Sequence, residues 1–291
     1  MRKAVAFAPG HISGFFQPMT DSEDLNKIGS RGAGVCIAHG ATAQVELLKS
    51  SKQKITIYIN NRIGKFPVTR RAAKHIIGEE NLEVTIKISL DVPGSYGFGM
   101  SAAGALSSSI ALANLLEKPD KMAIEAAHQA EVIHRTGLGD VCSSATGGFE
   151  IRKKPGITPY GEIQKISEQH SILLALFSGK MSTKSILTDK QHVQHISKIG
   201  SFCTNKVMQS PSVETIMKYS YYFTEKSGLA PTKILRILKR IKDDYLASMC
   251  MLGHSIFVLD YNEEIVQLLS KESTIIKTTV DTKGARIIEE Y

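Results

Sequence analysis

The sequence of 291 residues predicts an α+β protein with two domains. Three observations predict it: four strand-like segments lie in the first 90 residues, two helical segments follow them, and strands and helices are mixed again after a connection rich in proline and glycine. That connection contains Pro155, Gly156, Pro159 and Gly161. We place the domain boundary there, so that the domains comprise residues 1–158 and 159–291.

Each half contains both kinds of element. In the first half we expect strands over 3–8, 41–48, 54–59, 82–89 and 149–152, and helices over 100–117 and 120–135, with Asp120 as an N-cap. In the second half we expect strands over 171–177, 254–260 and 274–280, and helices near 183–199, 210–227 and 231–247. No internal repeat or low-complexity segment interrupts this order.

Composition is typical of a globular protein with a sizeable core, because 42% of the residues are hydrophobic and 22% are charged. The longest apolar runs are too short to cross a bilayer, and Pro9-Gly10 ends the first apolar segment too early for a signal peptide. We therefore expect a cytoplasmic protein without a membrane partner. Its four cysteines are widely spaced and are expected to be reduced thiols.

The net charge of +8 raises the question of a nucleic-acid partner. The densest basic run, 233–242, has the spacing of an amphipathic helix in which Ile234, Leu238 and Ile241 face inward. A solvated helix face explains such a run better than a nucleic-acid-binding stripe, so we expect no nucleic-acid partner. A mildly positive field also favours anionic substrates such as nucleotides and carboxylates.

The most informative motif is the glycine-rich segment that follows the strand at 82–89. Its glycines permit sharp turns and leave backbone N–H groups uncovered, and the helix behind it directs free N–H groups and a positive dipole end at the loop. Ser101, in the first turn of that helix, can reach a phosphate oxygen or a magnesium ion. The alternative is a structural turn before a close-packed alanine helix. The predicted phosphate-binding residues are Pro93, Gly94, Ser95, Gly97, Gly99, Ser101, Ala102 and Ala103.

Glu131 and Asp140 are the next informative pair. An acid late in a helix, followed by a glycine-containing turn with a second acid, can bring both carboxylates near the glycine loop. A kinase that acts on a hydroxyl needs a metal ligand for the ATP phosphates and benefits from a carboxylate that positions or deprotonates the hydroxyl. Two simpler interpretations stay open: a surface ion pair between Glu131 and Arg135, and a helix-capping role for Asp140.

A rival metal site overlaps this pair. His128, Glu131 and His134 have i, i+3, i+6 spacing on one arc of a helix and could hold zinc or iron. Ligands at this spacing diverge along the helix axis, and helical histidine pairs that bind metal prefer i, i+4. This interpretation is therefore the weaker one.

The glycine-rich loop and the Glu131–Asp140 pair resemble motifs of the GHMP kinase superfamily, which includes galacto-, homoserine and mevalonate kinases. The loop is similar to Pro-x-x-x-Gly-Leu-Gly-Ser-Ser-Ala-Ala, with Phe98 and Met100 in place of the leucine and the first serine. Four further segments resemble the archaeal pantoate kinases in the same order over nearly the whole chain: Pro-Gly-His-Ile-Ser-Gly-Phe-Phe from Pro9, Gly-Ser-Arg-Gly-Ala-Gly from Gly29, Gly-Leu-Gly-Asp-Val from Gly137 and Ser-Met-Cys-Met-Leu-Gly from Ser248.

The resemblance implies a fold and a reaction. The fold is a GHMP kinase-like two-domain fold, with an N-terminal nucleotide domain that contains a left-handed βαβ crossover and a C-terminal ferredoxin-like domain. The reaction is transfer of the γ-phosphate of ATP to the primary hydroxyl of pantoate, giving 4-phosphopantoate for coenzyme A biosynthesis in archaea. ATP and Mg²⁺ are the implied cofactors, Ser101 and Glu131 the implied metal ligands, and Asp140 the implied catalytic residue.

The same resemblance singles out the substrate side of the site. His11 stands where GHMP kinases usually carry the lysine of Ala-Pro-Gly-Lys, and as a second candidate catalytic residue it could donate a hydrogen bond or supply charge. The carboxylate of pantoate needs a cation or several donors; Arg31 is the candidate, with Ser30 and Ser13 as polar contacts. An ordinary surface arginine is the alternative. Gly253 either packs against the nucleotide loop or forms a simple turn.

Two other functions remain open at the level of sequence. One is a GHMP kinase with a mevalonate- or homoserine-like acceptor, and the other is a non-catalytic binding module on the same fold. A homodimer is expected only because it is the commonest assembly.

Overall fold

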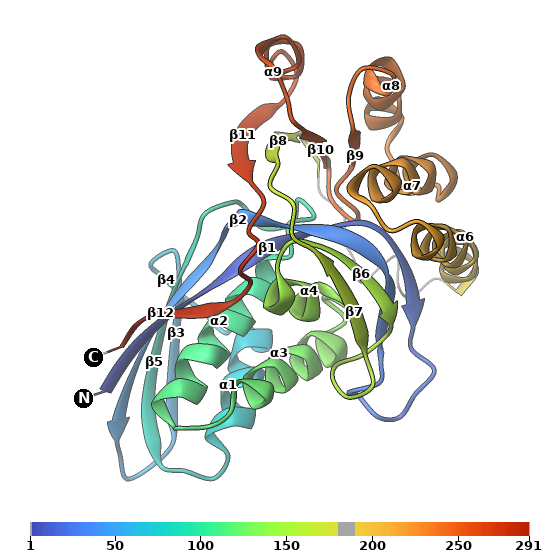
Figure 1. Cartoon of the computed structure of the whole chain (residues 1–291). Helices are drawn as coiled ribbons and strands as arrows, with labels where there is room; N and C mark the ends of the chain where they lie inside the picture. Colours follow the sequence, from blue (N-terminus) through green and yellow to red (C-terminus); the bar gives the residue numbers. More distant parts are fainter. Residues whose placement is uncertain (1, 180–189, 291) are drawn as a thin grey trace.

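The computed structural model describes residues 2–179 and 190–290, and within them the strands form two sheets (Figure 1). The larger, eight-stranded sheet has the order β12-β1-β2-β5-β3-β4. In addition, β6 pairs with residues 32–35 of β2, and β7 pairs with β6. The N and C termini lie side by side at one end of it (Figure 1). Its strands are β1 (Arg2–Met19), β2 (Gly29–Lys49), β3 (Lys54–Ile59), β4 (Arg62–Ile63), β5 (Leu82–Leu90), β6 (Phe149–Lys154), β7 (Glu162–Ile166) and β12 (Arg286–Glu290).

The smaller sheet is antiparallel throughout and has the order β11-β8-β10-β9. Figure 1 shows it beyond one end of the larger sheet, together with the helices of the second half. These elements are β8 (Ser171–Leu176), α6 (Lys190–Gln209), α7 (Val213–Lys226), α8 (Thr232–Ile241), β9 (Ala247–Met249), β10 (Ser255–Leu259), α9 (Glu263–Ser270) and β11 (Thr274–Thr279). The predicted α+β class is confirmed by this mixture.

Four helices gather on one face of the larger sheet: α1 (Pro67–Ile77), α2 (Met100–Leu115), α3 (Asp120–His134) and α4 (Asp140–Thr146) (Figure 1). The central helix α2 is made mostly of alanine, glycine and serine, so it packs tightly, and all its residues except Ser101 and Asn114 are buried. Because Ser101 is exposed at the start of this buried helix, it faces the cavity described below. In the chain, helix α1 follows β3 and β4 and precedes β5. The strands β3 and β5 pair in parallel.

The two N-terminal strands are much longer than predicted. β1 continues past the expected end at residue 8, through a register shift between Pro9 and Gly10, and β2 begins at Gly29 rather than at residue 41. His11 and Arg31 therefore both lie in paired strands. The segments that contain His11 and Arg31 are both part of the antiparallel pairing of β1 with β2.

Other limits also differ from the sequence predictions. Helix α1 was not predicted, Asp120 is the first residue of α3 rather than its N-cap, and α6 extends to Gln209 instead of ending near 199. The first residues expected in that helix, before 190, lie outside the described part of the chain. Ile234, Leu238 and Ile241 are buried as predicted, on the inner face of α8.

The described strands do not divide at residue 158. β7 and β12 follow that position and pair within the larger sheet. The division into residues 1–158 and 159–291 stays a prediction. In the described segments, helices long and apolar enough for a membrane span are absent.

Candidate active site

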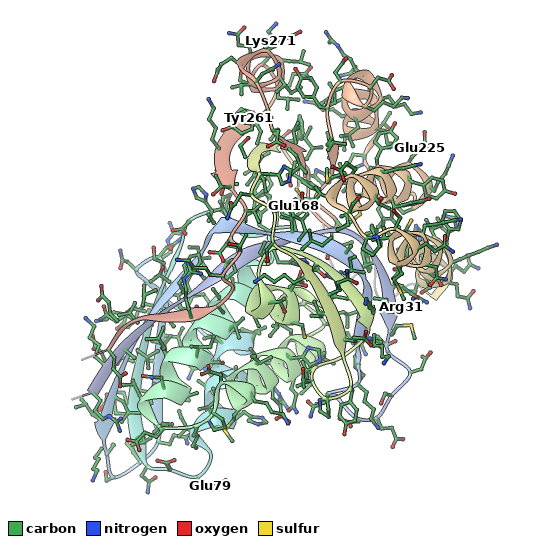
Figure 2. The ribbon with its side chains drawn as sticks, in the orientation of Figure 1. Arg31, Glu79, Glu168, Glu225, Tyr261 and Lys271 are labelled. Carbon is green, nitrogen blue, oxygen red and sulfur yellow. The ribbon has the colours of Figure 1, made fainter. Side chains whose placement is uncertain are left out.

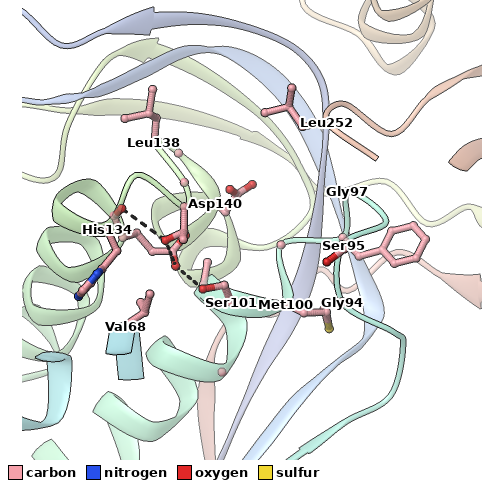
Figure 3. Close-up of a pocket in the computed structure, with 18 of the residues that line it drawn as sticks. Val68, Gly94, Ser95, Gly97, Met100, Ser101, His134, Leu138, Asp140 and Leu252 are labelled. Carbon is pink, nitrogen blue, oxygen red and sulfur yellow. Dashed lines mark hydrogen bonds between the residues drawn. The ribbon is translucent and has the colours of Figure 1, made fainter. Parts of the chain in front are cut away.

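A cavity of about 780 Å³ opens where the glycine loop meets the ends of α3 and α4 (Figure 3). One wall is the loop and the first turn of α2, and the opposite wall is the turn from His134 to Asp140. Met251 and Leu252 close the cavity from the side of the smaller sheet. Most residues predicted for the site meet here: Ser13, Ser30, Gly94, Ser95, Gly97, Gly99, Ser101, Ala102, Glu131 and Asp140 all line the cavity.

The glycine loop is fitted against the β9–β10 connection. Gly97 has a φ of +82°, and a Cβ on it would lie 2.9 Å from the carbonyl oxygens of Cys250 and Met251. A Cβ on Gly253 would lie only 2.0 Å from the carbonyl carbon of Tyr96, and Ser255 Oγ donates a hydrogen bond to the Tyr96 oxygen at 2.5 Å. Gly253 therefore packs directly against the loop, which settles the alternative left open by the sequence.

Helix α2 begins directly behind this loop. Its N-cap is Gly99, with a left-handed φ of +63°, and no side chain caps the helix. The free backbone N–H groups of the first turn are thus available at the cavity wall, which is the arrangement that binds phosphate.

Ser101 and Glu131 are joined across the cavity wall. Ser101 Oγ donates to Glu131 Oε1 at 2.5 Å, and Thr136 Oγ1 donates to the same oxygen at 2.8 Å (Figure 3). Burial, with the charge of Asp140 nearby, raises the pKa of Glu131 to about 7, although these two hydrogen bonds oppose the shift. A buried carboxylate whose charge is poorly compensated, beside a hydroxyl, is a donor set suited to Mg²⁺.

Asp140 lies opposite Glu131, with Gly137 between them. A Cβ on Gly137 would lie 2.4 Å from Glu131 Oε2 and 2.8 Å from Asp140 Oδ2, so both carboxylates face one small space. The other oxygen, Asp140 Oδ1, lies 2.7 Å from His11 Nδ1. Asp140 is thus held on one side by His11 and open to the cavity on the other.

Behind His11 lies a buried row of charged side chains. His11 Nε2 is 2.8 Å from Glu150 Oε1, and Arg152 Nη1 donates to that same oxygen at 2.5 Å. Arg152 also donates to Ser143 Oγ and to Ser13 Oγ. The side chains of His11, Glu150 and Arg152 are at most 2% exposed.

These contacts shift the pKa values of His11 and Asp140, the two residues that were predicted to be catalytic. Burial alone would lower the pKa of His11, but the hydrogen bonds to Asp140 and Glu150 outweigh it, so the pKa is raised. Burial alone would raise the pKa of Asp140, but the hydrogen bond and the charge of His11, helped by the charge of Arg152, lower it. Asp140 is therefore an anion at neutral pH.

Four predicted residues do not line the cavity: Pro93, Ala103, His11 and Arg31. The Arg31 guanidinium donates to Lys153 O at 3.0 Å, to Gln17 Oε1 at 3.2 Å and to Asn205 Oδ1 at 2.9 Å. Figure 2 shows Arg31 at the edge of the molecule, beside β6 and α6. The structure therefore does not bring Arg31 together with the other site residues.

Comparison with known proteins places this geometry in a family. Residues 67–148 match the model of the GHMP kinases N terminal domain. The chain is 34% identical over 266 residues to the pantoate kinase of Methanocaldococcus jannaschii, covering 91% of this chain and 95% of that protein. The chain belongs to the pantoate kinase family.

Further relatives agree. The pantoate kinase of Thermococcus kodakarensis is 33% identical, over 89% of this chain and 88% of its own length. A solved structure described as a phosphotransferase related to the CoA biosynthesis pathway superposes with a TM-score of 0.89 at 29% identity, with 99% of each chain covered. A mevalonate kinase, at 15% identity and a TM-score of 0.67 over 96% of this chain and 99% of its own, shares the fold.

In this member of the pantoate kinase family the rival metal site is not formed. His128 Nε2 lies 3.0 Å from Ile28 O and 3.2 Å from Leu25 O, whereas Glu131 is bound to Ser101 and Thr136. Groups of three or more His, Cys, Asp or Glu side chains placed to hold a metal are absent from the described segments. The Glu131–Arg135 ion pair is likewise replaced by the hydroxyl contacts of Glu131.

Sequence reasoning missed Glu150 and Arg152. Both lie in the predicted strand at 149–152, where charged residues alternating with Phe149 and Ile151 indicate one solvent-facing side. Both faces of this strand are covered instead, so the charged side chains are buried. One signal was available in the sequence: His11 stands where a lysine is usual. A buried histidine needs hydrogen-bond partners of its own.

Proposed function

We propose that this protein transfers the γ-phosphate of ATP to the primary hydroxyl of pantoate, giving 4-phosphopantoate and ADP. The observation that carries the proposal is the pair of carboxylates, Glu131 and Asp140, on either side of Gly137 and facing the glycine loop. One is suited to a cation and the other to a hydroxyl, which are the two requirements of phosphoryl transfer to an alcohol. Membership of the family supports pantoate as the acceptor.

ATP would lie along the cavity with its phosphates at the glycine loop and the N-terminus of α2. The apolar end of the cavity, formed by Ile59, Phe66, Val68 and Leu90, would accept the base. The backbone N–H groups of the loop would bind the phosphates without a lysine, because the helix dipole and the free N–H groups already favour an anion there.

Ser101 Oγ and the Glu131 carboxylate are the residues that would hold Mg²⁺. When bound there, Mg²⁺ neutralises charge on the ATP phosphates and stabilises the charge that develops on them during transfer. A divalent cation would also relieve the buried charge that raises the pKa of Glu131.

Asp140 would orient the acceptor. Because Oδ1 is engaged by His11, the free oxygen Oδ2 would accept the hydrogen bond from the primary hydroxyl of pantoate. The hydroxyl oxygen then forms a bond to the γ-phosphorus, the bond from that phosphorus to the β-phosphate oxygen breaks, and ADP leaves. The hydroxyl proton passes to Asp140 and from there to water in the cavity.

The carboxylate of pantoate would bind at a polar corner formed by Ser13 and Ser30, which both line the cavity. Arg152 lies directly behind this corner: its Nη2 donates to Ser13 Oγ at 3.2 Å, and its buried Nε has no hydrogen-bond partner in the described structure. A Cβ on Gly139 would lie 2.7 Å from both Arg152 Nε and Ser30 Oγ. Since Arg31 lies outside the cavity, we assign the positive charge of the carboxylate site to Arg152.

The test is acceptor-dependent release of ADP from Mg-ATP by the purified protein, with pantoate, mevalonate, homoserine and shikimate offered separately. Turnover with pantoate alone supports the proposal. Turnover with another acceptor would retain the kinase chemistry but contradict the assignment of the Ser13–Ser30 corner. Absence of turnover with all four, from protein that binds Mg-ATP, would favour a binding module.

We also expect a cytoplasmic enzyme that forms a homodimer. The cytoplasm supplies ATP and keeps thiols reduced, and the four cysteines here are buried and free. Light scattering after size-exclusion chromatography measures the assembly directly.

A further inference from the structure

His11 has an environment that a neutral imidazole does not satisfy. Its side chain is fully buried, and both ring nitrogens face carboxylate oxygens: Nδ1 faces Asp140 Oδ1 at 2.7 Å and Nε2 faces Glu150 Oε1 at 2.8 Å. A neutral imidazole has one N–H and one lone pair, so one of these short contacts would place a lone pair against a carboxylate oxygen. Only the imidazolium donates to both.

Glu150 is the member of the row that favours this charge. Its Oε1 accepts from Arg152 Nη1 while it faces His11 Nε2, and its Oε2 has no partner among the described residues, so both cationic side chains converge on one oxygen. With His11 charged, the row Asp140, His11, Glu150 and Arg152 alternates in sign and its charges cancel. With His11 neutral, a net negative charge would be buried next to Glu131, which is unfavourable.

One other charged group approaches the ring: Arg152 Nη1 lies 3.4 Å from His11 Nε2, farther than the 2.8 Å to Glu150 Oε1. Opposite His11 on β2 lies Cys36, whose thiol pKa is raised well above its ordinary value by burial, so it is uncharged. A Cβ on Gly34 would lie 2.6 Å from His11 Nε2 and 2.9 Å from Glu150 Oε1, so only glycine leaves room for the contact between them. The charged groups that face His11 are thus Asp140 on α4 and Glu150 and Arg152 on β6.

We propose that Glu150 is a positioning residue for phosphoryl transfer, which with Arg152 behind it fixes His11 as a doubly hydrogen-bonded imidazolium that in turn orients Asp140. The role of Asp140 in this statement rests on the proposed function, whereas the state of His11 does not. His11 N also donates to Phe98 O at 3.0 Å, so the same residue ties the carboxylate to the glycine loop.

One consequence concerns the proton of the acceptor hydroxyl. His11 already carries protons on both nitrogens and cannot take another, so it is not the final proton acceptor. The proton that Asp140 accepts must leave through Oδ2 and the cavity. Glu150 acts two side chains away from the reacting atoms, by keeping Oδ2 turned toward them.

The first experiment reads the protonation of His11 directly. Full-length protein with ¹⁵N-labelled histidine is examined by NMR at about pH 8, where an ordinary imidazole is neutral, and the His11 signals are assigned by their loss in His11→Gln. We expect two protonated ring nitrogens. A single protonated nitrogen in the wild-type protein would overturn the proposal, whatever the enzyme's activity.

The second experiment uses Glu150→Gln, with Glu162→Gln as a matched control on the neighbouring strand β7, where Glu162 pairs with the half-buried Lys153 and the exposed Lys154. We expect kcat of Glu150→Gln to fall about 10- to 100-fold, as for a misplaced reacting group, with little change in KM for ATP and with loss of the imidazolium signature. Glu162→Gln should retain both. An unchanged kcat in folded Glu150→Gln would overturn the positioning role.

Two safeguards keep the result interpretable. If Glu150→Gln does not fold, because Arg152 is left without its buried partner, Glu150→Asp retains the charge and must retain the imidazolium signature; its loss in folded protein contradicts the proposal. If no acceptor is phosphorylated by the wild type, the proposed function fails while the NMR result still decides the state of His11.

Discussion

Asp140 shows how one carboxylate divides its two oxygens between the fold and the substrate. Oδ1 is fixed by His11 at 2.7 Å, and Oδ2 faces the space beside Gly137. Because the pKa of Asp140 is lowered, its carboxylate is already ionised at neutral pH, and no other base is needed to deprotonate it. The residue is therefore ready to orient a hydroxyl before the reaction begins.

Asp140→Asn keeps this shape and removes the charge. We expect kcat to fall by about 10²- to 10⁴-fold, the usual contribution of a positioned acid or base, while the dissociation constant of ATP stays nearly unchanged. ADP release and calorimetric titration measure the two quantities. Asp120→Asn, at the exposed start of α3, is the control. Full activity of Asp140→Asn would remove Asp140 from the mechanism.

Glu131 gives a prediction about stability as well as metal binding. Its pKa is about 7 in the folded protein and 4.5 ordinarily, so between these values the folded state binds more protons than the unfolded state. The free energy of unfolding therefore falls as pH rises through this window, and the loss is complete above pH 7.

Glu131→Gln removes that charge. At about pH 8 with a chelator present, we expect the variant to be more stable than the wild type by roughly 3 kcal/mol, and to need more magnesium for turnover. Urea unfolding with and without added magnesium measures both effects. A variant less stable than the wild type under chelation would contradict the buried charge.

Among the elements, the glycine loop depends on a neighbour that is distant in sequence. Its backbone at Tyr96 and Gly97 touches Gly253, between β9 and β10 of the smaller sheet. The loop is thus positioned by both sheets and not by α2 alone.

Gly253→Ala should displace the loop. Its Cβ would lie 2.0 Å from Tyr96 backbone atoms, so we expect KM for ATP to rise by about tenfold or more, together with a stability loss of about 1–3 kcal/mol. Gly228→Ala, whose φ of +75° imposes strain without any neighbour within 4 Å, controls for destabilisation alone. Equal effects on KM in both variants would count against a specific role for Gly253.

Elements with strong local signals could be predicted from the sequence. α2 and α3 begin at the expected residues or next to them, and the acids at 131 and 140 meet the glycine loop as expected. Helix α1 also had a readable signal, in the apolar spacing of Val68, Ala72 and Ile76, with a proline at its first position.

Other features depend on pairings between distant segments. The strands β1 and β2 run through Pro9-Gly10 and Gly29–Gly34 because they support one another, and glycine is needed where His11 approaches Glu150. No local pattern shows that Glu150 and Arg152 are buried or that Arg31 is turned toward α6. These facts follow from which faces of a strand are covered.

For the whole molecule, His170 links the two sheets. Its ring lies edge-on to Phe149 of the larger sheet, with centroids 5.5 Å apart, and its Nδ1 is 2.7 Å from Asp260 Oδ2 beyond the end of β10. Burial lowers the pKa of His170, but Asp260 and Glu168 outweigh this and raise it. The stability gained is therefore present below the ordinary pKa of 6.5 and is lost as pH rises through the raised value.

His170→Gln should lower the melting temperature more at about pH 6 than at about pH 9, where the wild-type ring is neutral. The ion pair is partly exposed, so its share is below about 1 kcal/mol. Calorimetry at both pH values, with Asp260→Asn and the double variant completing a cycle, separates the charge from the ring contact. A loss independent of pH would assign the effect to packing against Phe149.

The last strand has a consequence for how the protein is made. β12, residues 286–290, pairs with β1, and Ala4 lies opposite Glu290. During synthesis, β1 and its neighbours leave the ribosome long before their outer partner exists, so this edge of the sheet stays open until β12 has been made. The strand that carries His11 is thus completed by a segment that lies far later in the chain, and a chain truncated before residue 286 would expose that edge to other nascent chains.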